Sequence, residues 1–332
     1  MKTGWFKTSL ILAGSLLLGA GAKAAKPLTI AYSDWPGWVA WQVAIDKGWF
    51  KKAGVNVKFI WFDYSPSLDA FTAGKVDAVC VTNGDCLAVG AGGAPSTCIV
   101  INDYSYGNDC IIAQPGIKSL KDLKGKKVGV EVGLVDNLLL DEALAKVGMT
   151  EKDIHIVNMP TNNLPQAFAS GGLDAIAAWQ PNAGNALRQV PGSKAIFTSR
   201  DLPGLIYDGL YVNRANLAKH KAEWAKVVKI WFKCVTYIKN PKTQAAAIKM
   251  MSARDGLTPA QYKAFLYGTK LHDLKMDYNA MKVGTGFTSI YGSSHVVDKF
   301  NVEHGVYKTL QFTPAYIDPE FVNALAKEDI KK

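Results

Sequence analysis

The sequence predicts an α/β protein of two similar lobes, each built on a doubly wound and mostly parallel sheet. One stretch of the chain occurs twice, because residues 70–85 (AFTAGKVDAVCVTNGD) match residues 167–182 (AFASGGLDAIAAWQPN). Short apolar segments also alternate with helical patterns of about ten to fifteen residues, which is typical of parallel strands joined by helices. The 332 residues are enough for two domains with cores of their own.

Both copies of the repeat read Ala-Phe-x-small-Gly-x-apolar-Asp-Ala-apolar, followed by a short apolar run and four polar or turn-prone residues. Two copies are too few for a solenoid, which needs at least three stacked units. We therefore interpret them as equivalent parts of two lobes that face each other across a cleft. The alternative is a chance match, because Gly-x-apolar-Asp-Ala is also an ordinary way to leave a helix and enter a buried strand.

The first lobe begins with a strand at 28–32, and the Pro-Gly pair at 36–37 marks a loop before a helix at 39–50. Gly54 ends that helical pattern. Further strands are expected at 55–62, 77–81 and 97–101, with a helix around Leu68 and Phe71. Residues 110–113 return as an antiparallel or crossover segment, and the polar stretch 115–127 is the first crossing into the second lobe.

In the second lobe the pattern restarts, with strands at 127–131, 154–158 and 174–178 and helices at 138–147 and 165–170. Segments 195–198 and 207–212 are expected to be strands that carry the chain back. Apolar residues then recur at helical spacing from Trp224 to Ile238, and helices at 257–267 and 316–326 should pack on the first lobe. The predicted division is 26–113 plus 210–332 for lobe 1 and 114–209 for lobe 2, joined by two crossovers.

Residues 1–24 have the pattern of a secretory signal peptide. Lys2 and Lys7 accompany an apolar run at 9–20, and Ala22-Lys23-Ala24 is a small-x-small cleavage site. The run is too short to span a bilayer. No cysteine stands near the cleavage site, so we expect an exported, periplasmic protein without a lipid anchor.

The formal net charge is +10, but the lysines are scattered, so a solvated surface explains them better than nucleic-acid binding. An odd number of cysteines without a CxxC spacing indicates neither a zinc site nor a disulfide framework, and whether one disulfide forms is left open. The five are Cys80, Cys86, Cys98, Cys110 and Cys234. The histidines are scattered and GxSxG, GxGxxG and HExxH are absent, so we expect no enzyme, cofactor or metal.

Four segments, in order and at their spacing, resemble a solute-binding protein of an ABC importer of the nitrate/sulfonate/taurine (NitT/TauT) type. They are LTIAYSDWPGWVAWQVAIDKGWFKKAGV, AFTAGKVDAV, SLKDLKGKKVGVEVG and AFASGGLDAIAAWQP. The resemblance covers nearly all of the chain after the signal segment. It implies the two-lobed type II periplasmic-binding-protein fold, whose lobes close on a small ligand and then dock on a membrane permease with its ATPase. A finer resemblance, to a urea-carboxylase-associated branch, implies guanidine or urea-type ligands.

The predicted strand ends carry acids and aromatic rings, with no lysine or arginine among them, although anions are frequent ligands in that family. Carboxylates beside aromatic faces suit a desolvated planar cation, because a guanidinium forms bidentate hydrogen bonds in its plane and cation–π contacts above it. Asp63 and Asp109 are interpreted as caps of helices or turns. The candidate ligand-binding residues are Asp34, Trp35, Trp38, Asn83, Asp85, Asp103, Tyr104, Glu131, Trp179 and Asp208.

The sequence hypothesis is that Asp85 and Glu131 clamp a guanidinium-type ligand from opposite lobes. One alternative keeps the fold but binds urea or an anionic sulfonate or nitrate. Another is an enzyme related to thiamine-pyrimidine synthesis, which the scattered histidines disfavour. A third alternative is a sensor that hands its closed state to a receptor, which would have the same sequence features as a transport protein.

Overall fold

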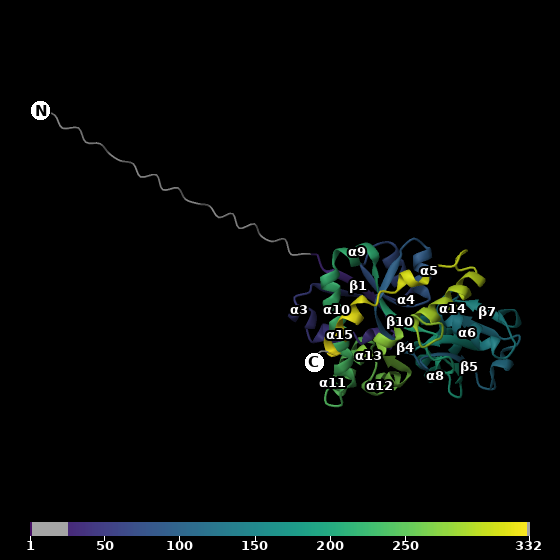
Figure 1. Ribbon diagram of the computed structural model, residues 1–332. Helices are drawn as coiled ribbons and strands as arrows, with labels where there is room; N and C mark the ends of the chain where they lie inside the picture. The colour runs from purple at the N-terminus through teal and green to yellow at the C-terminus, as the bar shows by residue number, and fades with distance from the viewer. Residues whose placement is uncertain (2–25, 331–332) are drawn as a thin grey trace.

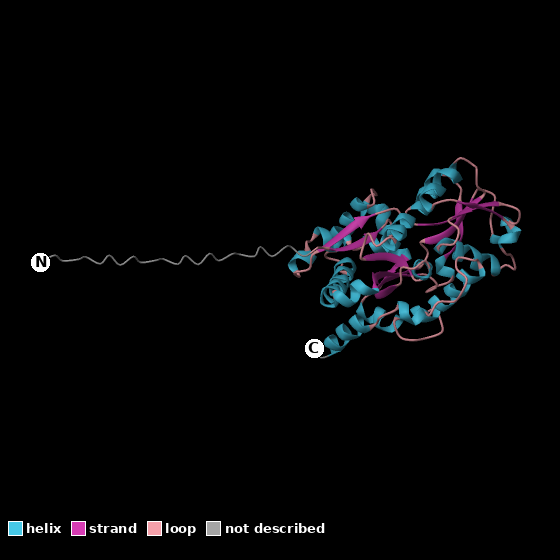
Figure 2. Cartoon of the chain, turned by 90° about the horizontal axis from the view of Figure 1, so that it is seen from above, coloured by secondary structure: helices cyan, strands magenta, loops and turns pink. Residues whose placement is uncertain are grey.

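The computed structural model describes residue 1 and residues 26–330, so the predicted signal segment lies outside the described residues apart from Met1. The strands form two separate sheets with helices around them, visible as two groups of magenta arrows in Figure 2. Figure 1 shows β1, α9 and α10 on one side of the molecule and α6, β5 and β7 on the other. The predicted α/β fold with two sheets is confirmed.

The first sheet has six strands in the order β11-β4-β10-β3-β1-β2. β1 is parallel to β2 and β3, whereas β10 is antiparallel to β3 and β4, and β11 is antiparallel to β4. The sheet is therefore mixed rather than mostly parallel. Its strands are β1 (Leu28–Tyr32), β2 (Val57–Trp61), β3 (Ala78–Thr82), β4 (Ser96–Ser105), β10 (Tyr207–Asn213) and β11 (Thr269–Leu271).

The second sheet has five strands in the order β7-β6-β8-β5-β9. β6 is parallel to β7 and β8, and β5 is antiparallel to both β8 and β9. In both sheets, therefore, three parallel strands are followed by an antiparallel one. The strands are β5 (Asp109–Ala113), β6 (Lys127–Val130), β7 (His155–Asn158), β8 (Ala175–Trp179) and β9 (Lys194–Thr198).

The two copies of the repeat occupy equivalent places, and one pair of aspartates makes this clear. Asp77, just before β3, accepts a hydrogen bond from the backbone N–H of Thr29 at 2.8 Å. Asp174, just before β8, accepts the same bond from Lys127 at 2.9 Å. Both carboxylates thus tie a repeat strand to the parallel strand beside it, β3 to β1 and β8 to β6.

The loops that follow the repeat strands also match. The backbone N–H of Asn83 donates to the carbonyl oxygen of Tyr207 at 2.8 Å, and that of Gln180 donates to Asn108 at 3.0 Å. Tyr207 and Asn108 stand at the start of the antiparallel strands β10 and β5. Each sheet therefore receives its antiparallel strand at the same point, next to the loop that follows its repeat strand.

Three predicted elements differ from the structure. The helix expected at 39–50 is three short helices, α1 (Pro36–Val39), α2 (Gln42–Asp46) and α3 (Trp49–Lys52). Gly48 breaks it with a left-handed φ of 62°, a conformation that glycine adopts at little cost. β4 continues to Ser105 through an expected loop, and the last helix begins at Glu320 rather than at 316.

The chain changes sheets between β4 and β5 and again between β9 and β10. The predicted division had placed 110–113 in lobe 1, but this segment is β5 of the second sheet, between β8 and β9. If the lobes follow the sheets, the first crossing therefore lies at 106–108. On the same assumption the second crossing lies at 199–206, whereas the predicted boundary at 209/210 falls within β10.

The helices cover both sheets. α10 buries the apolar face predicted for it, and its Trp231 packs against Trp41 with ring centroids 4.8 Å apart. All five cysteines are buried and free. The longer helices are α4 (Tyr64–Thr72), α5 (Asp85–Ala91), α6 (Val135–Ala145), α7 (Leu164–Ala169), α8 (Asn182–Gln189), α9 (Arg214–Lys219), α10 (Lys221–Lys239), α11 (Gln244–Arg254), α12 (Pro259–Gly268), α13 (Leu274–Ala280), α14 (Ile290–Glu303) and α15 (Glu320–Ile330).

A search of the described residues for membrane-spanning helices finds no helix with the necessary combination of length and apolar character.

Candidate functional site

A small cavity lies between residues of the two sheets, and we call it the inner cavity. It offers about 10 Å³ of free space, roughly what one water molecule needs. None of its lining side chains is a lysine or arginine. They are Trp35, Trp38, Tyr64, Thr82 and Asp208 from the first sheet and its loops, Asp109, Val135 and Trp179 from the second sheet and α6, and Ile206 at the crossing.

Four aromatic rings form one wall of the inner cavity. Trp38 stacks on Tyr64 with ring centroids 5.3 Å apart and an interplanar angle of 24°. Tyr64 meets Trp179 of the second sheet edge-on at 5.3 Å, and Trp35 meets Trp38 at 6.4 Å. The aromatic wall therefore contains rings from both sheets.

The loop after β1 explains how two of these rings are placed. Pro36 opens α1 at a position where its fixed φ fits a helix and its missing N–H is not needed. Gly37 follows, and a Cβ there would lie 1.7 Å from Oδ2 of Asp103. A glycine is required at this point because the chain passes directly against a buried carboxylate.

Asp103 and Asp208 form a carboxyl pair on the first sheet. They are directly opposite each other on β4 and β10, and both are buried. Trp35 donates its indole N–H to Oδ1 of Asp103 at 3.0 Å, but Oδ2 of each aspartate has no hydrogen-bond partner. We call these two residues the first carboxyl pair.

Asp109 and Asp136 form a second carboxyl pair at the edge of the second sheet. Asp109 begins β5, and Asp136 lies in the first turn of α6. Both are buried, and Oδ2 of Asp109 and both oxygens of Asp136 lack hydrogen-bond partners. Buried unpaired carboxylates are rare because each lacks the stabilisation that water would give it.

The pKa values of these acids are raised, chiefly by burial. Burial raises the pKa of Asp109 to about 6, and the neighbouring side chains of Ser105 and Asp136 offset part of that rise. Burial, and then the charge of Asp109, holds the pKa of Asp136 well above its ordinary value. The pKa of Asp208 is also well above its ordinary value, because of burial and then the charges of Asp103 and Asp109. The two pairs therefore affect each other across the cavity.

Asp34 and Asp85 support the aromatic wall from behind. Asp34 accepts hydrogen bonds from the indole of Trp179 at 3.2 Å and from the amide of Asn182 at 3.0 Å, which joins the two sheets. Asp85 accepts a hydrogen bond from the hydroxyl of Tyr64 at 2.5 Å. Burial raises the pKa of Asp34 to about 6 and that of Asp85 to about 7.

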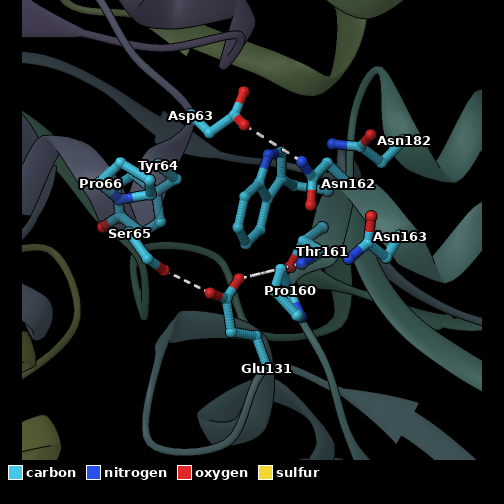
Figure 3. Close-up of a pocket in the computed structure, with 11 residues that line it drawn as sticks. Asp63, Tyr64, Ser65, Pro66, Glu131, Pro160, Thr161, Asn162, Asn163 and Asn182 are labelled. Carbon is cyan, nitrogen blue, oxygen red and sulfur yellow. Dashed lines mark hydrogen bonds between the residues drawn. The ribbon is translucent and has the colours of Figure 1, made fainter.

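A wider opening of about 170 Å³, the outer cleft, adjoins the inner cavity and shares Tyr64 and Trp179 with it (Figure 3). Glu131 points between its two walls. One carboxylate oxygen accepts a hydrogen bond from Ser65 of α4, and the other accepts two from Thr161, from the backbone N–H at 3.0 Å and the hydroxyl at 3.1 Å. Glu131 therefore connects the two sides of the cleft outside the inner cavity.

The structure gathers most of the predicted site residues around the inner cavity. Trp35, Trp38, Trp179 and Asp208 line it, and Asp103 is paired with Asp208. Asp34 and Asp85 are bonded to lining residues, while Glu131 lies in the outer cleft. A direct clamp by Asp85 and Glu131 is thus not the arrangement of this conformation, because both carboxylates hold protein partners.

Two predicted residues lie elsewhere. Asn83 donates its amide N–H to Ser293 at 2.9 Å and accepts the backbone N–H of Tyr207 at 3.0 Å, so it ties α14 to the start of β10. Tyr104 contacts Tyr207 and His272 away from the inner cavity. Side chains alternate along a strand, so Asp103 and Tyr104 point to opposite faces of β4.

Three residues of the site were missed. Tyr64 is not among the predicted residues, although its ring stacks on Trp38 in the wall of the inner cavity. Asp109 was interpreted as a turn cap, whereas its carboxylate lines the inner cavity with Oδ2 unpartnered. Asp136 precedes the apolar run that starts at 138, and this pattern places it in the first turn of a helix. An acid in that position usually caps the helix, but in this structure it is buried.

One group of metal-ligand side chains occurs among the described residues. Asp141, Glu151 and His304 place one ligand atom each within 4.8 Å of one another. Each already has a protein partner, since His304 pairs with Asp141 at 3.6 Å and Glu151 accepts a hydrogen bond from Asn137. None of the three lines the inner cavity or the outer cleft.

Comparison with known families identifies the chain. Residues 35–245 match the family model described as NMT1/THI5 like, and this span includes all residues that line the inner cavity. The chain belongs to the NMT1/THI5-like family. This NMT1/THI5-like chain is 30% identical over 203 residues to a protein of Brucella abortus named only as a binding protein. The match covers 60% of this chain and 63% of that relative, less than two thirds of its length.

Solved structures share the fold of this NMT1/THI5-like protein. The periplasmic aliphatic sulphonate binding protein SsuA from Escherichia coli has a TM-score of 0.74 at 19% identity, over 90% of this chain and 99% of that one. The desulfurization enzyme DSZB has a TM-score of 0.65 at 13% identity, over 91% and 99%. At these identities the likeness concerns the fold alone, which is the type II periplasmic-binding-protein arrangement.

Proposed function

We propose that this protein is the periplasmic solute-binding component of an ABC importer and captures a small planar cation, of the guanidinium type, between its two lobes. One observation carries the proposal. The inner cavity combines four aromatic rings with Asp109 and Asp208, and no basic side chain lines it. The role in transport rests on the NitT/TauT resemblance and on the binding-protein names among the relatives and structural neighbours.

A guanidinium ion fits this chemistry. Its N–H groups donate paired hydrogen bonds to carboxylates in its plane, and its faces are attracted to aromatic rings by about 2 kcal/mol when water is excluded. Such a ligand would satisfy the carboxylate oxygens of Asp109 and Asp208 that have no partner. A guanidinium has four non-hydrogen atoms, whereas the inner cavity offers only about 10 Å³. The bound form therefore requires the two sheets to move slightly apart relative to this conformation.

An anionic ligand is the main alternative, because the Escherichia coli neighbour binds aliphatic sulphonates. The lining supports a cation instead. An oxyanion next to Asp109 and Asp208 would meet carboxylate oxygens without any lysine or arginine to offset them. Urea has the shape of guanidinium but no charge, so it would leave the buried acids unneutralised and should bind more weakly.

The proposed importer supplies the partners. A permease and its ATPase would take the ligand from the closed protein, so the physiological role would be uptake of a nitrogen compound. Export through the predicted signal peptide, without a lipid anchor, would place the protein in the periplasm. The positive net charge does not steer a cation inward, but salt screens charges beyond about 8 Å, so the acids around the cavity dominate the local field.

An enzyme is the second class to test, because the fold also occurs in a desulfurization enzyme. The inner cavity offers no nucleophile activated by a neighbouring base. The two acids that line it, Asp109 and Asp208, each adjoin a further aspartate rather than a base. Cys80, Cys86 and Cys110 have pKa values raised by burial, which disfavours the thiolate. Chromatography of a candidate ligand after long incubation with the purified protein should therefore recover it unchanged.

A thermal-shift screen of small cations and anions tests the proposal. Guanidinium should raise the midpoint of unfolding with a saturable dose dependence, urea less so, and taurine and nitrate not at all. The Asp208→Asn variant should lose most of the guanidinium shift. A saturable shift with taurine or nitrate, retained in the variant, would contradict the proposal.

A further inference from the structure

The first and second carboxyl pairs are each associated with one of the two sheets, and one member of each, Asp208 and Asp109, lines the inner cavity. We infer that each lobe binds the ligand through its own carboxyl pair, so that the ligand must present N–H donors on two opposite edges. Asp208 and Asp109 make the contacts, while Asp103 and Asp136 act through them as positioning residues. This inference rests on the proposed function and defines the class of cation more narrowly.

The first pair is fixed by strand register. Asp208 also lies opposite Thr82 of β3, so the middle strand β10 directs its carboxylate into the cavity between two neighbours. Trp35 holds Asp103 from one side through its indole N–H. Like charges directly opposite on neighbouring strands are destabilising, so this arrangement calls for a compensating group.

The second pair comes from a strand and a helix. Asp109 and Asp136 are both buried, and each alters the pKa of the other. Asp109 lines the inner cavity, whereas Asp136 has an exposed fraction of 0%. Asp136 interacts electrostatically with Asp109 without lining the cavity, and we therefore assign it the positioning role.

The charged groups around the two pairs are acidic. Asp208 is subject to the charges of Asp85 and Asp109, and Asp136 to those of Asp85 and Glu131. None of the side chains that line the inner cavity is basic. A cation in the cavity is therefore the missing partner for both pairs, and the aromatic wall covers its face.

This arrangement predicts a specific order of affinities. Guanidinium carries N–H donors on all three edges, so it can engage both pairs at once. Acetamidinium has the same charge and nearly the same shape, but a methyl group replaces one amino group, so only one edge carries a full pair of donors. It should bind about 10- to 100-fold more weakly, the loss expected when hydrogen bonds to a charged group are left unmade.

Calorimetric titration of the purified wild-type protein with the two ions is the first test. Guanidinium binding with acetamidinium at least 10-fold weaker would support two-sided recognition. Equal affinities would overturn it while leaving the cation site intact. Failure of both ions to bind would instead overturn the proposed function, so the two failures are distinguishable.

The second test is the Asp109→Asn variant, with Asp141→Asn as its control. Asp141 lies on α6, one helical turn beyond Asp136, has a pKa that is also raised by burial, and pairs with His304 rather than facing the cavity. Asp109→Asn should weaken guanidinium binding by about 10-fold or more and should reduce the ratio of the guanidinium affinity to the acetamidinium affinity. Asp141→Asn should change neither. An unchanged ratio of the two affinities in a folded Asp109→Asn protein would contradict the inference.

Asp136→Asn tests the positioning role. The amide keeps the size of the side chain but never carries a negative charge, so Asp109 should stay ionised to lower pH. Guanidinium affinity should then fall less between pH 8 and pH 6 than it does in the wild type. A purely structural role for Asp136 would change the midpoint of thermal unfolding but leave this pH profile as it is, and that result would refute the positioning role.

Discussion

Asp208 of β10 and Asp103 of β4 are directly opposite each other, both buried, and each has a carboxylate oxygen without a hydrogen-bond partner. Two like charges in that position oppose folding unless they are protonated or neutralised. The second carboxyl pair also combines two buried acids, Asp109 of β5 and Asp136 of α6, and Asp109 lines the inner cavity. Stability without ligand, pH and cation binding should therefore be linked in this protein.

The ligand-free protein should become more stable as the pH falls from about 8 to about 5. Asp109 and Asp85 have pKa values of about 6 and about 7 in the folded state, against an ordinary aspartate pKa of 3.8. At pH values between these limits, the folded state therefore holds more protons than the unfolded state. Each extra proton held contributes about 1.4 kcal/mol per pH unit, present at low pH and lost as the pH rises through the folded pKa.

Urea unfolding at pH 8, 6.5 and 5 measures this dependence. The Asp208→Asn variant, which removes one member of the first carboxyl pair, should show a smaller gain on acidification than the wild type. If the free energy of unfolding changes with pH in the same way in both proteins, or falls from pH 8 to pH 6.5 in both, the buried acids do not control the pH dependence of stability.

The Tyr64→Phe variant should be destabilised at high pH. It removes the hydroxyl that donates to Asp85 at 2.5 Å and leaves a buried carboxylate oxygen unpaired, at a cost of about 1–3 kcal/mol. The cost should be smaller at pH 5, where Asp85, with a pKa of about 7, is protonated. Tyr104→Phe, away from the cavity, is the control, and equal losses in both variants at both pH values would count against the role of Tyr64.

The Glu131→Gln variant should release ligand faster. Glu131 accepts hydrogen bonds from Ser65 on one side of the cleft and from Thr161 on the other, so it stabilises the closed form without lining the inner cavity. The dissociation rate of guanidinium should rise about 3- to 10-fold, with little change in association.

Stopped-flow measurement of tryptophan fluorescence follows this release, because Trp179 borders both the inner cavity and the outer cleft. Glu142→Gln, on α6, is the matched control. If Asp85→Asn and Glu131→Gln both leave guanidinium affinity unchanged, the sequence hypothesis of a clamp by these two acids is wrong even in its indirect form.

The two repeat aspartates should affect stability and leave binding unchanged. Asp77 accepts the backbone N–H and hydroxyl of Thr29 and the amide of Asn216, so Asp77→Ala should lower the free energy of unfolding by about 2 kcal/mol. Asp174 accepts one backbone N–H and is more exposed, so Asp174→Ala should cost about 1 kcal/mol. A change in guanidinium affinity in a folded variant would show that the repeat does more than join strands.

The strands were predictable because their signal is local. The repeat strands and Leu28–Tyr32 are short apolar runs bounded by polar residues, and their bounds agree with the prediction to within about one residue. The helix at 39–50 failed for a local reason too. Its apolar pattern is continuous through Trp49 and Phe50, but the backbone turns at Gly48, and a hydrophobic pattern does not record a single left-handed residue.

The site was only partly predictable because its acids meet through long-range pairing. Asp103 and Asp208 were chosen from their places at strand ends, yet the sequence does not show that register sets them face to face. Asp109 and Asp136 occupy a strand start and a helix turn, where acids usually serve as caps, so their burial depends on how α6 packs against β5. Tyr104 was chosen beside Asp103, but strand alternation turned it to the other face.

Calorimetric titration of the wild-type protein at pH 8 with guanidinium and, in parallel, with taurine tests the central claim most directly. We predict saturable binding of one guanidinium per chain and no binding of taurine, because the inner cavity presents carboxylates and aromatic rings to its ligand. Saturable binding of taurine, with none of guanidinium, would contradict it.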